Sequence, residues 1–357
     1  MTQFHPLTIK EIRRETPECI SILFSIPDDL KEEYKFEPGQ NITIKLQLGD
    51  EEIRRSYSIC SSPHENELRV AVKHLEGGRF SSHANSSLKT GDVVQVLPPT
   101  GKFNPKSSAP GAKNYLAFAA GSGITPVISI IKSILQKDSE SHFTLVYGNR
   151  ARGSIIFKEQ LEAIKNKNMD RFAMHHILSR EQADADVYHG RIDKEKCEIL
   201  SKYLIDINGM DHFFICGPEE MIFTVRDWLL EKGVAKEKIH FELFTVPGEK
   251  SKTTSSKITA TSGEKSAITI KVDGKSTSFS HPYEGSSILD GALQHGADLP
   301  FACKGGVCAT CRAKLISGQV EMDTNYALEE DELAAGFILT CQSHPRSAEV
   351  FIDFDVR

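Results

Sequence analysis

The stretch Cys303-Lys-Gly-Gly-Val-Cys308-Ala-Thr-Cys311, with Cys341 thirty residues later, decides how this 357-residue chain is organised. Its spacing, C-x4-C-x2-C…C, is that of the ligands of a plant-type [2Fe–2S] cluster, in which four thiolates hold two irons. The small residues Gly305, Gly306 and Ala309 keep the loop tight and let backbone N–H groups turn toward the sulfurs, where they tune the reduction potential. We therefore predict that all four cysteines are metal ligands.

Zinc is the competing interpretation of these cysteines. Zinc ribbons usually present two C-x2-C pairs, whereas only residues 308–311 have that spacing here and the loop before them is longer and glycine-rich. The spacing therefore favours the cluster. The cysteines at 19, 60 and 197 have no partners in the sequence, and we expect them to be small buried hydrophobic residues.

Two different patterns precede the cysteine stretch. Up to residue 105 the chain shows short strands, at 41–48, 55–60, 68–74 and 93–97, separated by Gly and Pro residues, which predicts an antiparallel β-barrel. From residue 114 to 245 strands alternate with helices, which predicts an α/β domain with a parallel sheet. The expected strands are 115–119, 143–147, 172–178 and 213–216, and the expected helices include 156–164 and 219–231.

The predicted domains are a β-barrel at 1–107, an α/β domain at 108–245, a flexible linker at 246–265 and an α+β, β-grasp-like cluster domain at 266–357. The linker is poor in large apolar residues and rich in Ser, Thr and Lys. The last domain begins with a strand at 268–272 and a helix at 286–295, for which Ser286 or Ser287 is the expected N-cap.

Charge and hydropathy exclude several classes of function. The net charge is −6, and residues 266–357, with 13 Asp+Glu and 7 Lys+Arg, carry the whole excess. The missing basic footprint argues against nucleic-acid binding. The acidic segment suits a protein partner with a basic docking face, or serves only solubility. Without a signal peptide or a membrane-length apolar run, we expect a cytoplasmic protein that does not bind membranes.

Two motifs in the α/β domain predict a nicotinamide cofactor. Gly121-Ser-Gly123-Ile-Thr125-Pro126 lies between a strand and a helix, where glycines allow close approach of a pyrophosphate; the alternative is an ordinary turn. Cys216-Gly217-Pro218 follows a parallel strand at the sheet edge where ligands bind, or simply begins a helix. Ser179-Arg180 can bind a 2′-phosphate, with a simply solvated Arg as the alternative, and Arg150 can add to this pocket. We favour NADPH and leave NADH open.

Two motifs in the barrel are suited to a flavin. Arg55-Ser-Tyr57-Ser58 supplies a cation for a phosphate, an aromatic ring for the isoalloxazine and a hydroxyl for a ring nitrogen. Gly77-Gly78-Arg79-Phe80-Ser81 can form a backbone nest around a pyrophosphate. Each motif alone is weak, and the argument depends on their occurring together.

In this order the motifs resemble the ferredoxin–NADP⁺ reductase superfamily with a C-terminal ferredoxin domain, over the whole chain except the linker. Segments 55–63, 147–150, 178–181 and 303–312 look most like the reductase subunits of phenylacetyl-CoA epoxidases. The resemblance implies catalytic roles for Ser58 and Cys216. It implies cofactor contacts for the following residues: Arg55, Tyr57, Ser58, Val72, Lys73, Gly78, Arg79 and Ser81 with FAD; Gly121, Gly123, Thr125, Arg150, Ser179, Arg180, Cys216 and Gly217 with the nicotinamide cofactor; and Phe244 beside the flavin.

The resemblance implies a reductase that passes electrons from NADPH through FAD and a [2Fe–2S] cluster to an oxygenase. The same architecture serves ring-hydroxylating and steroid oxygenases, so these remain alternative electron-accepting partners (clients). A non-catalytic redox sensor is the alternative from another class, but the three cofactor sites account for the whole chain. The linker composition suggests the hypothesis that the ferredoxin domain shuttles between the flavin and the partner, so that shortening the linker would slow turnover with the partner.

Overall fold

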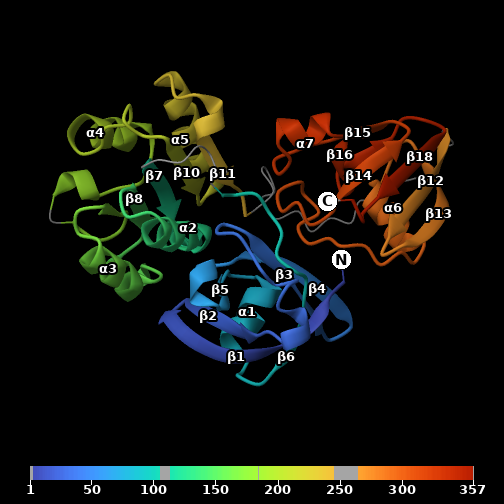
Figure 1. Cartoon of the computed structure of the whole chain (residues 1–357), viewed down its shortest axis with the longest axis horizontal. Helices are drawn as coiled ribbons and strands as arrows, with labels where there is room; N and C mark the ends of the chain where they lie inside the picture. Colours follow the sequence, from blue (N-terminus) through green and yellow to red (C-terminus); the bar gives the residue numbers. More distant parts are fainter. Residues whose placement is uncertain (1–2, 105–112, 184, 245–263, 357) are drawn as a thin grey trace.

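The computed structural model describes residues 3–104, 113–183, 185–244 and 264–356. They form three domains, each with a sheet of its own (Figure 1). The predicted linker lies outside the described residues except for its last two positions. Within the described ranges, no helix is both long enough and apolar enough to span a membrane.

The N-terminal domain is the expected antiparallel barrel. Its sheet has the order β4-β3-β6-β1-β2-β5, and a bridge between Ile59 and Val70 joins the chain beyond β4 to β5. Helix α1 (Arg79–Ser86) places Phe80 and Ala84 in the barrel core. The strands are β1 (His5–Thr16), β2 (Cys19–Ser25), β3 (Asn41–Leu48), β4 (Glu51–Ser58), β5 (Leu68–Lys73) and β6 (Val93–Val96).

The second domain is a parallel five-stranded sheet with the order β11-β10-β7-β8-β9. Successive residues of β7 face opposite sides: Leu116 packs in one core cluster and Ala117 in the other. Helices therefore cover both faces. The strands are β7 (Asn114–Ala120), β8 (His142–Asn149), β9 (Phe172–Leu178), β10 (His212–Cys216) and β11 (Ile239–Glu242), and the helices are α2 (Ile124–Lys137), α3 (Lys158–Lys167), α4 (Lys194–Tyr203) and α5 (Glu219–Glu231).

Two of the element boundaries that differ from the sequence prediction have a direct physical reason. Helix α3 begins at Lys158, two residues later than expected, because Phe157 has a φ of 61°, which a right-handed helix excludes. Strand β4 begins at Glu51, four residues earlier than expected, because it pairs with β3 along its full length. The earlier start matters for the site, because it brings Arg54 into the strand.

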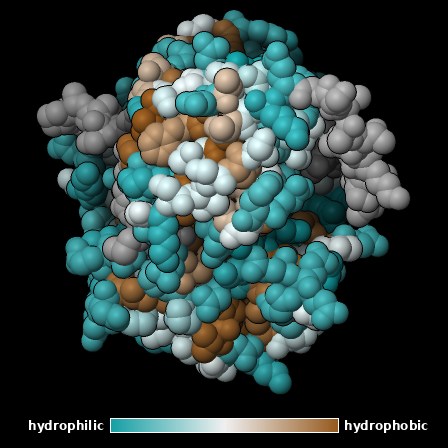
Figure 2. Space-filling model, turned by 90° about the vertical axis from the view of Figure 1, so that its right-hand side faces the viewer, coloured by the Kyte–Doolittle hydropathy of each residue, from teal (hydrophilic) through white to brown (hydrophobic). Residues whose placement is uncertain are grey.

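The C-terminal domain has a mixed sheet with the order β13-β12-β18-β14-β16, in which β12 and β18 are parallel. This confirms the α+β expectation. Ser287 caps α6 by accepting a hydrogen bond from the Asp290 N–H. On the side of the molecule that Figure 2 faces, hydrophilic residues separate small apolar patches. The elements are β12 (Lys265–Val272), β13 (Lys275–Pro282), α6 (Ile288–Gln294), β14 (Arg312–Ser317), β15 (Val320–Met322), α7 (Glu330–Ala334), β16 (Phe337–Leu339), β17 (Ser343–Pro345) and β18 (Glu349–Asp353).

Candidate functional site

The four predicted ligand cysteines gather in two pairs. Cys303 and Cys308 hydrogen-bond to each other, as do Cys311 and Cys341. In the described part of the chain no three His, Cys, Asp or Glu side chains converge on one metal ion; the thiols meet two by two instead. Each hydrogen bond lowers the pKa of one thiol, Cys308 or Cys341, and raises the pKa of its partner, Cys303 or Cys311. The arrangement fits a two-iron cluster with two sulfurs on each iron.

The loop around these thiols has an unusual backbone. Lys304, Gly306 and Ala309 have φ values of 54°, 76° and 54°, in the left-handed region. A non-glycine residue there costs free energy and persists where the surroundings require it. The tight turns aim N–H groups at the sulfurs: the Gly305 N–H donates to Cys303 Sγ at 3.3 Å. The predicted role of the small residues in this loop is thus visible in the hydrogen bonds.

An interdomain cavity of about 370 Å³ lies where the three domains meet. The barrel contributes part of its wall through β3 and β4, the parallel sheet contributes the end of β11 and the residues after it, and the cysteine loop closes it. The lining residues are Asn41, Arg55, Ser56, Ser58, Glu242, Leu243, Phe244, Ala302, Cys303, Val307 and Cys308. The cavity is thus assembled from distant parts of the chain. It places the flavin motif next to the cysteine loop.

Ser58 and Glu242 face each other across this cavity. The Ser58 hydroxyl donates to Glu242 Oε2 at 2.9 Å. Burial raises the pKa of Glu242 to about 8, and the Ser58 hydrogen bond opposes part of that rise. The carboxyl group is therefore largely neutral at neutral pH. Cys216 pairs with Glu242 in the β10–β11 register, and burial raises the pKa of its thiol well above the usual value, so the thiol is neutral as well.

The barrel residues of the flavin motif lie on β4. Tyr57 packs against Phe80 with ring centroids 5.3 Å apart, which fixes its ring at the barrel surface. Arg55 is exposed and lines the cavity, and its guanidinium donates to the Arg54 carbonyl at 2.7 Å. The motif thus offers a cation, an aromatic ring and a hydroxyl on one strand that ends at the cavity.

The Gly77–Ser81 segment does more than form a loop, because Gly78 is the N-cap of α1. Ser81 Oγ accepts the Leu75 N–H at 3.1 Å and donates to the Gly78 carbonyl at 3.2 Å. The helix start presents backbone donors and a positive dipole end, as an anion site requires. The Arg79 guanidinium forms an ion pair with Glu51 and donates to the Leu48 carbonyl, both in the β3–β4 hairpin.

Two further predicted flavin residues lie on β5. The Val72 carbonyl accepts a hydrogen bond from Asn85 Nδ2 at 3.0 Å, which ties the strand to α1. Lys73 Nζ approaches the turn at Gly121, where a Cβ would lie 3.7 Å from it. Lys73 therefore connects the barrel with the glycine turn of the parallel domain.

The glycine turn begins with a residue of positive φ, Gly121 at 54°, whose carbonyl accepts from the Tyr147 hydroxyl at 2.9 Å. Thr125 Oγ1, in the first turn of α2, donates to the Ser122 carbonyl at 3.0 Å. A Cβ on Gly123 would lie only 2.0 Å from the Cys216 carbonyl oxygen. Gly123 is thus required for contact with the protein's own backbone, independently of any ligand.

The other predicted nicotinamide residues surround this turn. A Cβ on Gly217 would lie 2.7 Å from Met221 Cε. Ser179 and Arg180 follow β9 and lie beside the end of β8: the Arg180 N–H donates to the Arg150 carbonyl at 2.9 Å. Both guanidinium groups are exposed, and within the described residues neither has a carboxylate partner. This backbone hydrogen bond places both residues at the same end of the sheet, with their side chains exposed.

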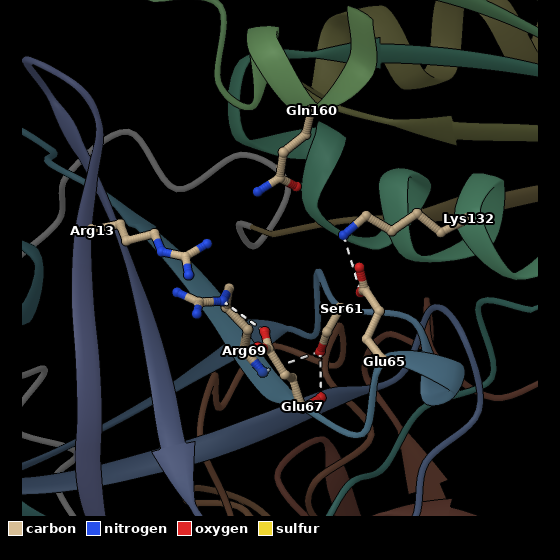
Figure 3. A pocket seen from close by; sticks show the side chains of 7 residues that line it. All are labelled: Arg13, Ser61, Glu65, Glu67, Arg69, Lys132 and Gln160. Atoms are coloured by element: carbon tan, nitrogen blue, oxygen red, sulfur yellow. Dashed lines mark hydrogen bonds and ion pairs between the residues drawn. The ribbon is translucent and has the colours of Figure 1, made fainter. Parts of the chain in front are cut away.

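A second cavity, of about 340 Å³, lies between the barrel and the parallel domain (Figure 3). Its cations are paired: Lys132 with Glu65 at 3.1 Å and Arg69 with Glu67 at 3.2 Å. The Arg13 guanidinium, which also lines it, pairs with Glu11 at 2.6 Å. Because these charges neutralise one another, we assign no ligand to this cavity.

Sequence reasoning gave no role to several residues of the interdomain cavity. Glu242 lies two residues before Phe244, which is expected beside the flavin and which is 40% exposed and lines the cavity. Asn41 is buried, and its Oδ1 has no hydrogen-bond partner within the described structure. Neither residue belongs to a recognisable motif, and only the tertiary arrangement of the strands places them in the wall.

Comparisons with known proteins agree with this architecture. The chain matches an oxidoreductase FAD-binding domain over residues 6–104, an oxidoreductase NAD-binding domain over residues 118–227 and a 2Fe-2S iron-sulfur cluster binding domain over residues 270–346. The fold and the site thus define an oxidoreductase that binds FAD, a pyridine nucleotide and a [2Fe–2S] cluster.

Relatives over the full length narrow this class. The chain is 44% identical to a 1,2-phenylacetyl-CoA epoxidase component of Escherichia coli (strain K12), covering 100% of this chain and 99% of that protein. It is 32% identical to the 3-ketosteroid-9-alpha-monooxygenase ferredoxin reductase component of Rhodococcus rhodochrous, covering 98% and 96%. The chain belongs to the ferredoxin–NADP⁺ reductase superfamily, in the group whose members carry a C-terminal ferredoxin domain.

Solved structures share the fold. Phthalate dioxygenase reductase superposes with a TM-score of 0.59 at 24% identity, covering 98% of both chains. A self-sufficient type IV cytochrome P450 monooxygenase superposes with a TM-score of 0.68 at 20% identity, covering 98% of this chain and 41% of that one. The three-domain fold therefore recurs both as a separate protein and as part of a longer one.

Proposed function

We propose that this protein is a cytoplasmic reductase that delivers electrons from NADPH to an oxygenase of the phenylacetyl-CoA epoxidase type. The observation that carries the proposal is the interdomain cavity, whose wall combines the flavin motif at Arg55 and Ser58 with two cluster ligands, Cys303 and Cys308. The 44% identity to the E. coli epoxidase component over the full chain supports this client.

The proposed function assigns the residues to a flavin site, a nicotinamide site and a cluster site. When bound, FAD accepts a hydride from the nicotinamide and the [2Fe–2S] cluster accepts single electrons. Arg55 and the start of α1 would bind the flavin phosphates, and Tyr57 would lie against its ring. The neutral Ser58–Glu242 pair would hydrogen-bond at the ring edge without adding charge. The neutral Cys216 thiol would position the nicotinamide, because Gly123 holds its backbone against the glycine turn.

The preference for NADPH depends on the two exposed cations at the sheet edge. Arg150 and Arg180 follow adjacent parallel strands, and the Ser179 hydroxyl, next to Arg180 in sequence, donates to the Asn149 carbonyl at 3.4 Å. Two guanidinium groups and a hydroxyl suit a 2′-phosphate, which NADH lacks. The domain limits proposed above, 1–107, 108–245 and 266–357, assign one cofactor to each domain.

The client is tested with purified components. The reductase is mixed with the oxygenase component of a phenylacetyl-CoA epoxidase, and NADPH consumption is followed with and without phenylacetyl-CoA. We expect the substrate to accelerate NADPH consumption. A matched reaction contains the oxygenase component of a 3-ketosteroid monooxygenase with its steroid. If only the steroid reaction is accelerated, the chosen client is wrong while the electron-transfer function stands.

A further inference from the structure

The ferredoxin domain contacts the rest of the molecule through oppositely charged residues. Glu330 pairs with Lys236 of the nicotinamide domain at 2.5 Å. Glu332, with a side chain only 4% exposed, pairs with Lys102 of the barrel at 2.9 Å and with its own Arg312 at 2.7 Å. These pairs flank the cysteine loop and define one docked position of the domain.

Arg54 makes the most extensive contact in this interface. Its side chain is 6% exposed, and Nη1 donates to the Leu299 carbonyl of the ferredoxin domain at 2.9 Å. Nη2 lies 3.4 Å from Asp298 Oδ1. The guanidinium also lies 4.2 Å from the centroid of the Phe301 ring, a cation–π contact that burial strengthens. One side chain thus contacts Asp298, Leu299 and Phe301 in the segment that leads into Cys303.

The barrel holds Arg54 in place from the other side. Glu52 Oε1 accepts from Arg54 Nε at 2.7 Å, and the Phe4 ring centroid lies 5.0 Å from the guanidinium carbon. Arg54 precedes Arg55 of the flavin motif, and Phe301 precedes Cys303 by two residues. The contact therefore joins the wall of the flavin cavity to the cluster loop across a short, rigid path.

A second polar contact lies on the same path. Thr310, between Cys308 and Cys311, is 3.2 Å from Thr43 Oγ1 and 3.5 Å from Ser56 Oγ on the barrel. Together with Arg54 it fixes the cysteine loop at both ends against β3 and β4. Electron transfer depends on holding the two redox groups at a fixed separation, so these contacts set the geometry of that step.

We propose that Arg54 is a positioning residue for electron transfer: it clamps the 299–301 segment of the ferredoxin domain so that the cluster loop is held at the flavin cavity. The proposal rests on the proposed reductase function and assigns a role that none of the motifs contains. Arg54 does not touch the reacting atoms; it acts through Phe301 and the loop that follows.

The test uses the full-length holoprotein with Arg54→Gln and Arg54→Lys. Under anaerobic conditions, rapid mixing with NADPH separates flavin reduction from the later reduction of the cluster. Loss of a charge-assisted hydrogen bond and a cation–π contact predicts cluster reduction slower by about tenfold in Arg54→Gln. Flavin reduction should be unchanged. Arg54→Lys keeps the charge but not the planar stacking, so we expect a rate between the two.

Hydrogen exchange provides a second measurement that does not depend on catalysis. Hydrogen exchange of the oxidised protein should become faster in residues 299–303 of Arg54→Gln, because the clamp no longer protects them. Lys45→Gln is the matched control: Lys45 pairs with Arg54 in the β3–β4 register and shares Glu52 and Phe4 with it, and every contact that the structure gives its side chain lies within the barrel. Lys45→Gln should leave both rates and the exchange unchanged.

Three results would overturn the proposal. The first is an unchanged rate of cluster reduction in Arg54→Gln. The second is an equal slowing of flavin reduction in that variant, which would mean that Arg54 stabilises the barrel. The third is the same slowing of cluster reduction in Lys45→Gln. A wild-type protein whose flavin NADPH fails to reduce would instead refute the proposed function, so the two failures are distinguishable.

Discussion

Replacing Gly123 by alanine tests how closely the glycine turn and the Cys216 loop must approach each other. Gly123 has φ −60° and ψ −10°, which alanine adopts freely, so any effect is steric. The added Cβ would lie 2.0 Å from the oxygen and 2.4 Å from the carbon of the Cys216 carbonyl. Carbon atoms in contact prefer about 3.5–4.0 Å, so the loop must retreat by roughly 1 Å or more.

Two opposing free energies decide the size of the effect. Overpacking of this kind costs about 1–3 kcal/mol of folding stability. Alanine also lowers the conformational entropy of the unfolded chain, which stabilises the folded protein by about 0.4–1 kcal/mol. Because this gain is smaller than the overpacking cost, Gly123→Ala should be destabilising. Because Cys216 and Gly217 move with the loop, the nicotinamide is also displaced, and a 1 Å misplacement can slow the chemical step by about 100-fold.

Urea unfolding measures the stability change, and anaerobic rapid mixing with NADPH measures flavin reduction. Gly153→Ala is the control in the same domain, because a Cβ there meets nothing within 4 Å and its φ is not in the left-handed region. We expect Gly153→Ala to behave as wild type or to be slightly more stable. If Gly123→Ala matches Gly153→Ala in both measurements, the steric argument is wrong.

Three further perturbations follow from the site and the core. Cys341→Ser removes one of four ligands, so cluster iron should be lost while NADPH-dependent ferricyanide reduction by the flavin persists; retention of iron and of cytochrome c reduction would contradict the ligand assignment. Arg180→Gln should raise the KM for NADPH by about tenfold or more and leave the KM for NADH unchanged, and an equal change for both cofactors would show that this Arg does not bind the 2′-phosphate. Trp228 is fully buried, and its Nε1 donates to Glu198 at 3.0 Å. In urea unfolding Trp228→Ala should cost about 3–5 kcal/mol and Trp228→Phe about 1 kcal/mol, and equal losses would mean that the hydrogen bond, not the packing, dominates.

The parts of the fold that could be predicted are those set by local pattern. The helix at Glu219–Glu231 and the strand at Phe172–Leu178 have the predicted bounds, because their apolar periodicity and flanking turns are contained within the segment. Helix α1 was missed because its sequence, from Arg79 to Ser86, is polar and has a low helix propensity. Gly77 and Gly78, which are expected to form a backbone nest, precede this helix, and Gly78 is its N-cap.

In the candidate site, too, local motifs could be predicted from the sequence and long-range contacts could not. The cysteine ligands were recognisable because three of them lie within nine residues. The Ser58–Glu242 pair joins residues 184 positions apart and depends on how the barrel meets the parallel sheet. The Arg54 contact spans 245 positions and joins two domains. Such pairings follow from interdomain packing, for which a single sequence carries no periodic signal.

The cavity wall formed by Cys303 and Cys308 has a consequence for biogenesis. Most of the flavin motif lies in the barrel, which is synthesised before the ferredoxin domain, but one wall of its cavity comes from that later domain. Before that domain is made, the barrel and the parallel sheet present the cavity open on one side. We therefore expect the flavin to load most easily before the ferredoxin domain docks, because that domain closes one side of the cavity.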